Sequence, residues 1–178
     1  EQSLITSFSN ENKTGADINY GENFRRYAQD WMDEISVNVN VSRLAGLSYD
    51  PTCRAIAIDN LNARSLPTDE VSFYNYQLAG EGYPFDNLQM SAVWAGTPLY
   101  IIAETSDHAW SLVLTPDFMA WVKTNGLART SQDFVNSWLS TAKNNLAAIT
   151  QTKTSIIDEQ GGFLFSAYVG SFFPATTT

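Results

Sequence analysis

The sequence has only one cysteine, Cys53, and one histidine, His108, among its 178 residues. A single cysteine excludes a disulfide within the chain and a metal site built from several thiolates. No window of 18 uncharged apolar residues occurs, so we expect no segment that spans a bilayer. A phosphate-binding glycine loop, a His-Glu-x-x-His motif and a calcium-binding loop are also missing. We therefore expect no metal and no other cofactor.

Positive charge is scarce as well. The chain has 10 Lys and Arg against 19 Asp and Glu, which gives a formal net charge of −9. Nucleic acid and anionic membranes would be repelled, so neither is an expected partner. Charged residues make up only 16% of the chain, so Asn, Thr, Ser and Gln must supply much of the surface. Such a surface suits contacts with sugars or peptides, and it is equally an ordinary extracellular surface.

The chain is 44% hydrophobic and 13% aromatic, which is enough to form a core. Residues 1–21 are polar without a sustained period, and we expect an extended arm there. Apolar residues recur at helical spacing over 22–35, which predicts a helix that buries Phe24 and Trp31 against the following domain. The strict alternation over 37–41 predicts a short strand or an extended linker.

Short β segments separated by turn residues follow. The predicted strands cover residues 55–59, 99–103, 110–114 and 119–122. Residues 104–108 look like a hairpin turn. Strands of this length and spacing predict a small barrel at 61–128.

The last part of the chain repeats this pattern faintly. Thr130-Ser131-Gln132-Asp133 resembles a capping box, which predicts a helix after it. Further strands are predicted at 146–150, 154–158 and 163–167. The stretch 91–98 resembles 166–174, which we interpret as the start of a second barrel. The predicted fold is therefore mainly β with two helices, divided into 1–60, 61–128 and 129–178.

No catalytic set is evident in the sequence. Cys53 lacks any nucleophile signature and is read as a small residue packed at the entrance of a strand. Asp107 and His108 form a possible acid–base pair without a partner nucleophile, so a small hydrolase remains an alternative. Among the remaining carboxylates, Glu81, Asp86 and Glu104 cannot be placed as a glycosidase pair from sequence. We assign no catalytic residue.

Tyrosines in the polar loops are the stronger signal. Tyr74, Tyr76 and Tyr83 are either core residues or a recognition surface, because an amphipathic ring can pack and hydrogen-bond together.

Several short motifs occur in a specific order. They are Arg64-Ser65-Leu66-Pro67-Thr68, Gly82-Tyr83-Pro84-Phe85-Asp86-x-x-Gln89, Trp94-x-Gly96-Thr97-Pro98, Ser106-x-x-x-Trp110 and Trp121-Val122. Together they resemble the first bacterial SH3-like domain of NlpC-type cell-wall cysteine peptidases. The helix before them resembles the N-terminal stabilising segment of those proteins, and 158–174 resembles the opening of their second SH3-like domain.

The resemblance implies a secreted or cell-envelope protein that cleaves peptidoglycan stem peptides after γ-D-glutamate. The family's catalytic domain follows the SH3-like domains, and nothing in these residues resembles it. The chain would then be a non-catalytic docking region that positions the stem peptide for that missing domain. The family's first SH3-like domain reads the free amino end of the peptide with acidic and aromatic groups. The candidate ligand-binding residues are Tyr74, Tyr76, Glu81, Tyr83 and Asp86. The alternative is a stand-alone secreted SH3-like protein that binds a wall fragment or a protein partner.

Overall fold

The computed structural model of the chain describes residues 2–40, 44 and 46–176. These residues form three α-helices, α1 (Gln2–Phe8), α2 (Gln29–Val39) and α3 (Gln132–Asn144). The strands are β1 (Arg54–Ala57), β2 (Leu61–Arg64), β3 (Gln89–Val93), β4 (Pro98–Glu104), β5 (Trp110–Leu114), β6 (Met119–Lys123), β7 (Leu127–Arg129), β8 (Leu146–Ala148), β9 (Lys153–Ile157), β10 (Phe163–Tyr168) and β11 (Phe172–Pro174). The predicted class, mainly β with an N-terminal helical segment, is confirmed, and α1 is a helix in addition to the two predicted.

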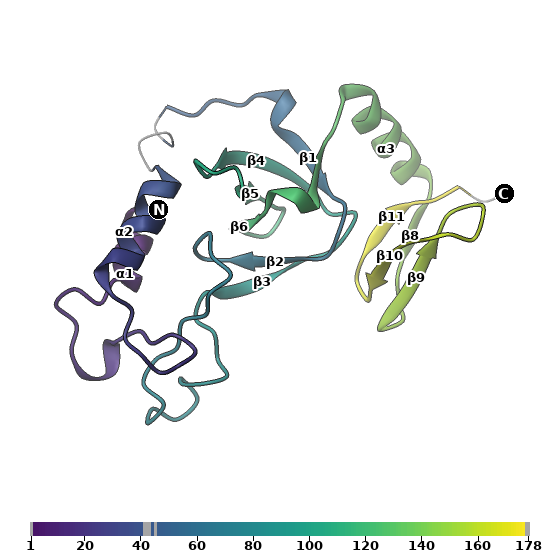
Figure 1. Cartoon of the computed structure of the whole chain (residues 1–178). Coiled ribbons are helices and arrows are strands. Elements are labelled where there is room, and N and C mark those ends of the chain that lie inside the picture. The colour runs from purple at the N-terminus through teal and green to yellow at the C-terminus, as the bar shows by residue number, and fades with distance from the viewer. Residues whose placement is uncertain (1, 41–43, 45, 177–178) are drawn as a thin grey trace.

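The centre of the molecule is a seven-stranded antiparallel sheet with the order β3-β2-β6-β5-β4-β1-β7 (Figure 1). Small and branched side chains fill its interior, among them Ala63, Val93, Ile101 and Val113. Successive side chains along a strand point to opposite faces of the sheet, so the face of each strand that carries these residues lies toward the core. The strands β1, β4, β5 and β6 lie where the sequence predicts them, within two residues at each end.

Helices α1 and α2 cover a second core on one flank of the sheet (Figure 1). Ile5 of α1 and Met32, Ile35 and Val39 of α2 are buried there. They pack with Leu66, Leu88, Trp110, Leu112 and Trp121. Burial of each large apolar side chain stabilises this docking by roughly 1.5–3 kcal/mol. The expectation that the N-terminal helix packs on the barrel is therefore confirmed.

The predicted bounds of that helix are wrong. It begins at Gln29 instead of residue 22, because the backbone before it makes β-type contacts: Tyr20 forms isolated bridges with Arg26 and with Phe73. It also continues to Val39, where a strand or linker was expected from 37, and ends at Asn40 in the left-handed conformation. Residues 41–43 lie outside the described residues.

Two further expectations for the N-terminal part are wrong. Residues 2–8 form α1, although an extended arm was expected. Phe24 is 51% exposed and meets the edge of Tyr76 at 6.1 Å between ring centroids, so it is not buried on the barrel. Trp31 is half-buried against the second core and stacks on Tyr27 at 3.8 Å.

A long loop, residues 65–88, connects β2 to β3 and is held at its base by a buried ion pair. The side chains of Arg64 and Asp86 are only 6% and 13% exposed. Arg64 Nη1 donates to Asp86 Oδ2, and Nε donates to the Thr68 carbonyl at 3.1 Å. Asp86 Oδ1 accepts from the amides of Ser72 at 3.0 Å and Leu88 at 2.9 Å. The pair therefore ties both ends of the loop to β2.

The C-terminal part consists of α3 and two small antiparallel sheets, β9 with β10 and β8 with β11. The Ser131 hydroxyl caps α3 by accepting from the Phe134 amide at 3.1 Å, one residue later than the predicted cap at Thr130. This part lies beyond β1 and β3, on the side of the central sheet away from α1 and α2 (Figure 1).

Specific contacts fasten the C-terminal part to the central sheet. Asn60 donates from Nδ2 to the Ser166 carbonyl at 2.7 Å and accepts at Oδ1 from the Ala95 amide at 3.1 Å. Trp94 meets Tyr168 at 5.0 Å between ring centroids. Gly96 has a φ of +88°, and a Cβ there would lie 2.4 Å from Cε1 of Phe173. The absence of a side chain at Gly96 therefore allows β11 to approach.

We predict that Gly96→Ala loosens this contact. The new methyl group would clash with Phe173 and also strain a left-handed backbone, with a combined cost of roughly 2–4 kcal/mol. Gly161→Ala is the matched control, because Gly161 has a φ of +84° with nothing within 4 Å. Thermal unfolding, monitored by tryptophan fluorescence, measures the loss of stability in both variants. Equal loss in the two variants would contradict the packing role of Gly96.

We predict that Asp86→Ala destabilises the fold by about 3–5 kcal/mol, because it leaves the Arg64 guanidinium buried without its counter-charge. The comparison is Asp69→Ala, which removes the exposed pair between Asp69 and Lys123 and should cost at most about 1 kcal/mol. Urea unfolding gives both values. A loss for Asp86→Ala no larger than that for Asp69→Ala would show that the buried pair does not hold the loop.

Candidate functional site

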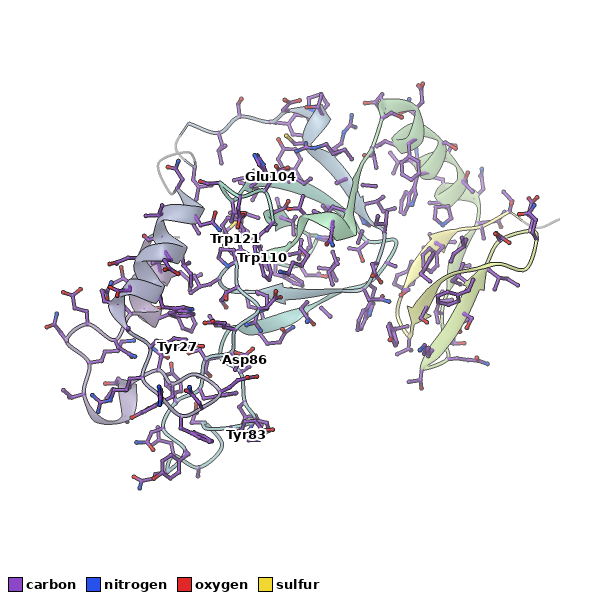
Figure 2. All side chains as sticks on the ribbon, in the orientation of Figure 1. Tyr27, Tyr83, Asp86, Glu104, Trp110 and Trp121 are labelled. Atoms are coloured by element: carbon purple, nitrogen blue, oxygen red, sulfur yellow. The ribbon has the colours of Figure 1, made fainter. Side chains whose placement is uncertain are left out.

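The candidate residues from the sequence all lie on the long loop 65–88, at the end of the molecule away from α3 (Figures 1 and 2). Tyr76 and Tyr83 are 68% and 67% exposed, and Glu81 is exposed too. Tyr74 is half-buried, and its amide donates to the Glu81 carbonyl at 3.3 Å. This part of the loop therefore presents two tyrosine rings and the Glu81 carboxylate to solvent.

These exposed rings rest on anchored ones. Tyr83 meets Phe73 edge-on at 5.6 Å between ring centroids. Phe73 is buried, and its backbone exchanges two hydrogen bonds with Tyr20, at 2.8 and 2.9 Å. Tyr76 meets Phe24 of the N-terminal segment. A ring held at one edge loses less conformational freedom when it binds a ligand, so the arrangement suits recognition.

Asp86 has a different environment from the other four candidates. Its carboxylate lies between Tyr83 and the sheet and accepts from Arg64, Ser72 and Leu88 (Figure 2). These partners occupy both of its oxygens. Asp86 is therefore placed to set the shape of the loop.

An acidic cleft of about 430 Å³ adjoins the loop. Glu22 and Tyr27 of the N-terminal segment line it together with Asp69 and Glu70 of the loop. The three carboxylates are exposed, and Lys123 pairs with Asp69. A hollow lined by carboxylates and a tyrosine favours a cation, above all an amine that donates several hydrogen bonds.

Tyr27 forms the inner wall of this acidic cleft. Its hydroxyl donates to the Val71 carbonyl at 2.6 Å, and its ring stacks on Trp31. Burial raises the pKa of Tyr27 well above its usual value, and the nearby carboxylates of Glu70 and Asp86 raise it further. The phenol therefore keeps its proton and its hydrogen bond across the physiological pH range.

Sequence reasoning did not find the acidic cleft. The predicted helix over 22–35 contains Glu22 and Tyr27, and nothing in the sequence brings it to Asp69, about 45 residues further along the chain. The β bridge between Tyr20 and Phe73 brings these segments together, and the hydrogen bond from the Tyr27 hydroxyl to the Val71 carbonyl adds to it. The one available signal was the pair Asp69-Glu70 directly after the Arg64-to-Thr68 motif.

The hydrolase alternative gains no geometric support from the described residues. The Asp107 carboxylate accepts from the Thr105 hydroxyl at 2.6 Å and the Ala109 amide at 3.0 Å. His108 Nδ1 lies 3.0 Å from Glu104 instead. The hydrogen bond from His108 lowers the pKa of Glu104, and Arg129 adds to this against the opposing effect of partial burial.

Cys53 is half-buried at the end of the 3₁₀ turn Pro51–Cys53, immediately before β1. Among the described residues, no three His, Cys, Asp or Glu side chains gather as metal ligands would. In the same part of the chain no helix is long and apolar enough to cross a membrane.

Comparison with known proteins identifies two domains. Residues 72–123 match the SH3 domain of SH3b1 type, and residues 131–176 match the SH3 domain of SH3b2 type. No curated protein sequence matches the chain.

A solved structure from Photobacterium damselae subsp. piscicida, described as a novel NlpC/P60 endopeptidase, is similar with a TM-score of 0.80 and 28% sequence identity. The match covers 99% of this chain and 37% of the endopeptidase, so most of that protein has no counterpart here. The resemblance found in the sequence motifs is thereby confirmed. The chain thus contains two bacterial SH3 domains, one of SH3b1 type and one of SH3b2 type, and shares the fold of the matching part of an NlpC/P60 endopeptidase.

Proposed function

We propose that this chain is the wall-binding, non-catalytic region of a secreted peptidoglycan peptidase. In this proposal it holds a stem peptide by its free amino end and presents the peptide to a catalytic domain outside these residues. The likeness to an NlpC/P60 endopeptidase supports the type of parent protein. The observation that carries the peptide-binding role is the acidic cleft beside the tyrosine-bearing loop of the SH3b1 domain.

The chemistry of the acidic cleft supports an amine as the bound group. An ammonium group would donate to Glu22 and Glu70 and lie near the ring of Tyr27. Lys123 pairs with Asp69, and among the described residues no ion pair engages Glu22 or Glu70, so these two carboxylates are available to a ligand. The hollow is open to solvent, so we expect a moderate affinity.

The exposed tyrosines would contact the rest of the peptide. In the proposal Tyr76 and Tyr83 pack against the peptide backbone, with Tyr74 and Glu81 at the margin of the same surface. Asp86 acts by positioning the loop, since Arg64 and two amides engage its carboxylate.

We predict that the chain binds a synthetic stem peptide with a free amino end at least about tenfold more tightly than the same peptide acetylated at that end. In the proposed mode, γ-D-glutamate precedes a diamino acid in this peptide. Glu70→Gln should reduce affinity for the free peptide about fivefold and leave the acetylated peptide unaffected. Isothermal titration calorimetry measures both.

Glu34→Gln is the matched control, because Glu34 is an exposed carboxylate of α2 that does not line the acidic cleft. Equal affinity for the free and acetylated peptides would remove amine recognition from the proposal. Equal losses in Glu34→Gln and Glu70→Gln would point to overall charge as the cause.

We predict that Tyr83→Ala weakens binding of the free stem peptide about fivefold to tenfold without moving the urea midpoint, because the side chain is mostly solvated. Tyr49→Ala is the control, since Tyr49 is 68% exposed and lies on a different segment. Unchanged affinity in Tyr83→Ala would exclude this ring from the peptide surface.

A further inference from the structure

A second cleft, of about 530 Å³, lies between the two SH3 domains. One wall comes from β3 and the turns after β3 and β5, within the SH3b1 match, and the other from α3 and the segment 170–172 of the SH3b2 match. The described residues that line it all differ from those that line the acidic cleft. Cavities of this size at domain boundaries are common places for small ligands.

Four aromatic side chains line this interdomain cleft. Trp94 and Phe118 come from the SH3b1 domain, and Trp138 and Phe172 from the SH3b2 domain. Trp94 is steadied by its contact with Tyr168. Phe172 is 54% exposed, although apolar side chains of this size are normally buried. Rings from both domains thus face one hollow.

Polar groups of a particular kind stand between the rings. Asp117 contributes an exposed carboxylate, and Ser91, Thr97 and Ser171 contribute hydroxyls. Ser171 is only 3% exposed, and its hydroxyl has no hydrogen-bond partner among the described residues. An unpaired buried hydroxyl is costly, so a polar ligand that reached it after a small rotation of the side chain would be stabilised.

The absence of cationic side chains narrows the chemistry of the ligand. None of the described residues that line the interdomain cleft is Lys or Arg, and Asp117 adds negative charge. A carboxylate or phosphate ligand would therefore be repelled. An uncharged pyranose fits better, because its C–H face packs on an aromatic ring while its hydroxyls donate to Asp117 and pair with the Ser and Thr hydroxyls.

We propose that the interdomain cleft binds an uncharged segment of a polysaccharide made of pyranose rings, with Trp94 and Trp138 as packing surfaces and Asp117 as a hydrogen-bond acceptor. This site goes beyond the peptide recognition proposed above and does not depend on it. A chain with both sites would hold a glycan strand and a peptide at once.

The test is a titration of the ¹⁵N-labelled full chain with chitotetraose and, in parallel, cellotetraose, followed by NMR. The five tryptophans give separate indole N–H signals, assigned with single Trp→Phe variants. We expect the signals of Trp94 and Trp138 to shift in proportion to bound sugar. The signals of Trp110 and Trp121, which are buried in the second core, should stay in place. Binding of chitotetraose alone would show that acetamido groups contribute, and binding of both sugars would show that the pyranose rings suffice.

Two variants localise the site. Asp117→Asn and Phe172→Ala should each weaken sugar binding about tenfold, and both positions are exposed, so the fold should persist. Glu159→Gln, an exposed carboxylate in the turn between β9 and β10, is the matched control. The proposal is overturned if neither sugar shifts Trp94 or Trp138 at millimolar concentration, or if all three variants bind like the unmodified chain. The result is independent of the stem-peptide titration, which monitors the other end of the molecule.

Discussion

The buried ion pair between Arg64 and Asp86 is the interaction on which the long loop 65–88 and the acidic cleft beside it depend. It closes the base of a 24-residue loop, 65–88, that has no helix or strand of its own. The closed loop places Phe73 where its backbone can pair with Tyr20. That pairing carries Glu22 and Tyr27 to Asp69 and Glu70. One buried ion pair thus determines the shape of a cleft at the surface of the domain. A buried ion pair of this kind contributes more to the specific arrangement of the chain than to its net free energy of folding.

The central fold was largely predictable from the sequence, and the acidic cleft was not. Strands such as Trp110–Leu114 and Met119–Lys123 carry a local apolar pattern between turn residues, which is enough to place them. Helix α2 was misplaced because the apolar spacing around Phe24 is helical, while a tertiary β bridge at Tyr20 extends that backbone. Propensity is a weak preference that such contacts override. Asp86 illustrates the same limit. Its carboxylate is buried because it pairs with Arg64, 22 residues earlier in the chain, and the residues next to Asp86 in the sequence do not indicate this pairing.

The acidic composition of the chain has a consequence at each of the two clefts. A net charge of −9 lowers the local concentration of anionic polymers and raises that of amines. In the proposed function, the acidic cleft would add to this attraction of amines through Glu22 and Glu70. The interdomain cleft, with one carboxylate and no cation among its described lining residues, suits a ligand without charge. The negative charge of the chain therefore favours a different ligand at each cleft: an amine where carboxylates line the cleft, and an uncharged ligand where aromatic rings line it.

The contacts at the domain boundary bear on what the two proposed sites could do together. Asn60 links the backbones at Ala95 and Ser166, and Gly96 leaves room for Phe173, so the SH3b2 domain has a defined position on the SH3b1 sheet. With the position fixed, the distance between the interdomain cleft and the acidic cleft is fixed as well. A polymer bound at one cleft would then reach the other cleft at a high effective concentration only if its peptide branch is long enough to span the distance between the two clefts. Geometry, more than the strength of either contact, would decide which part of a branched wall polymer the chain retains.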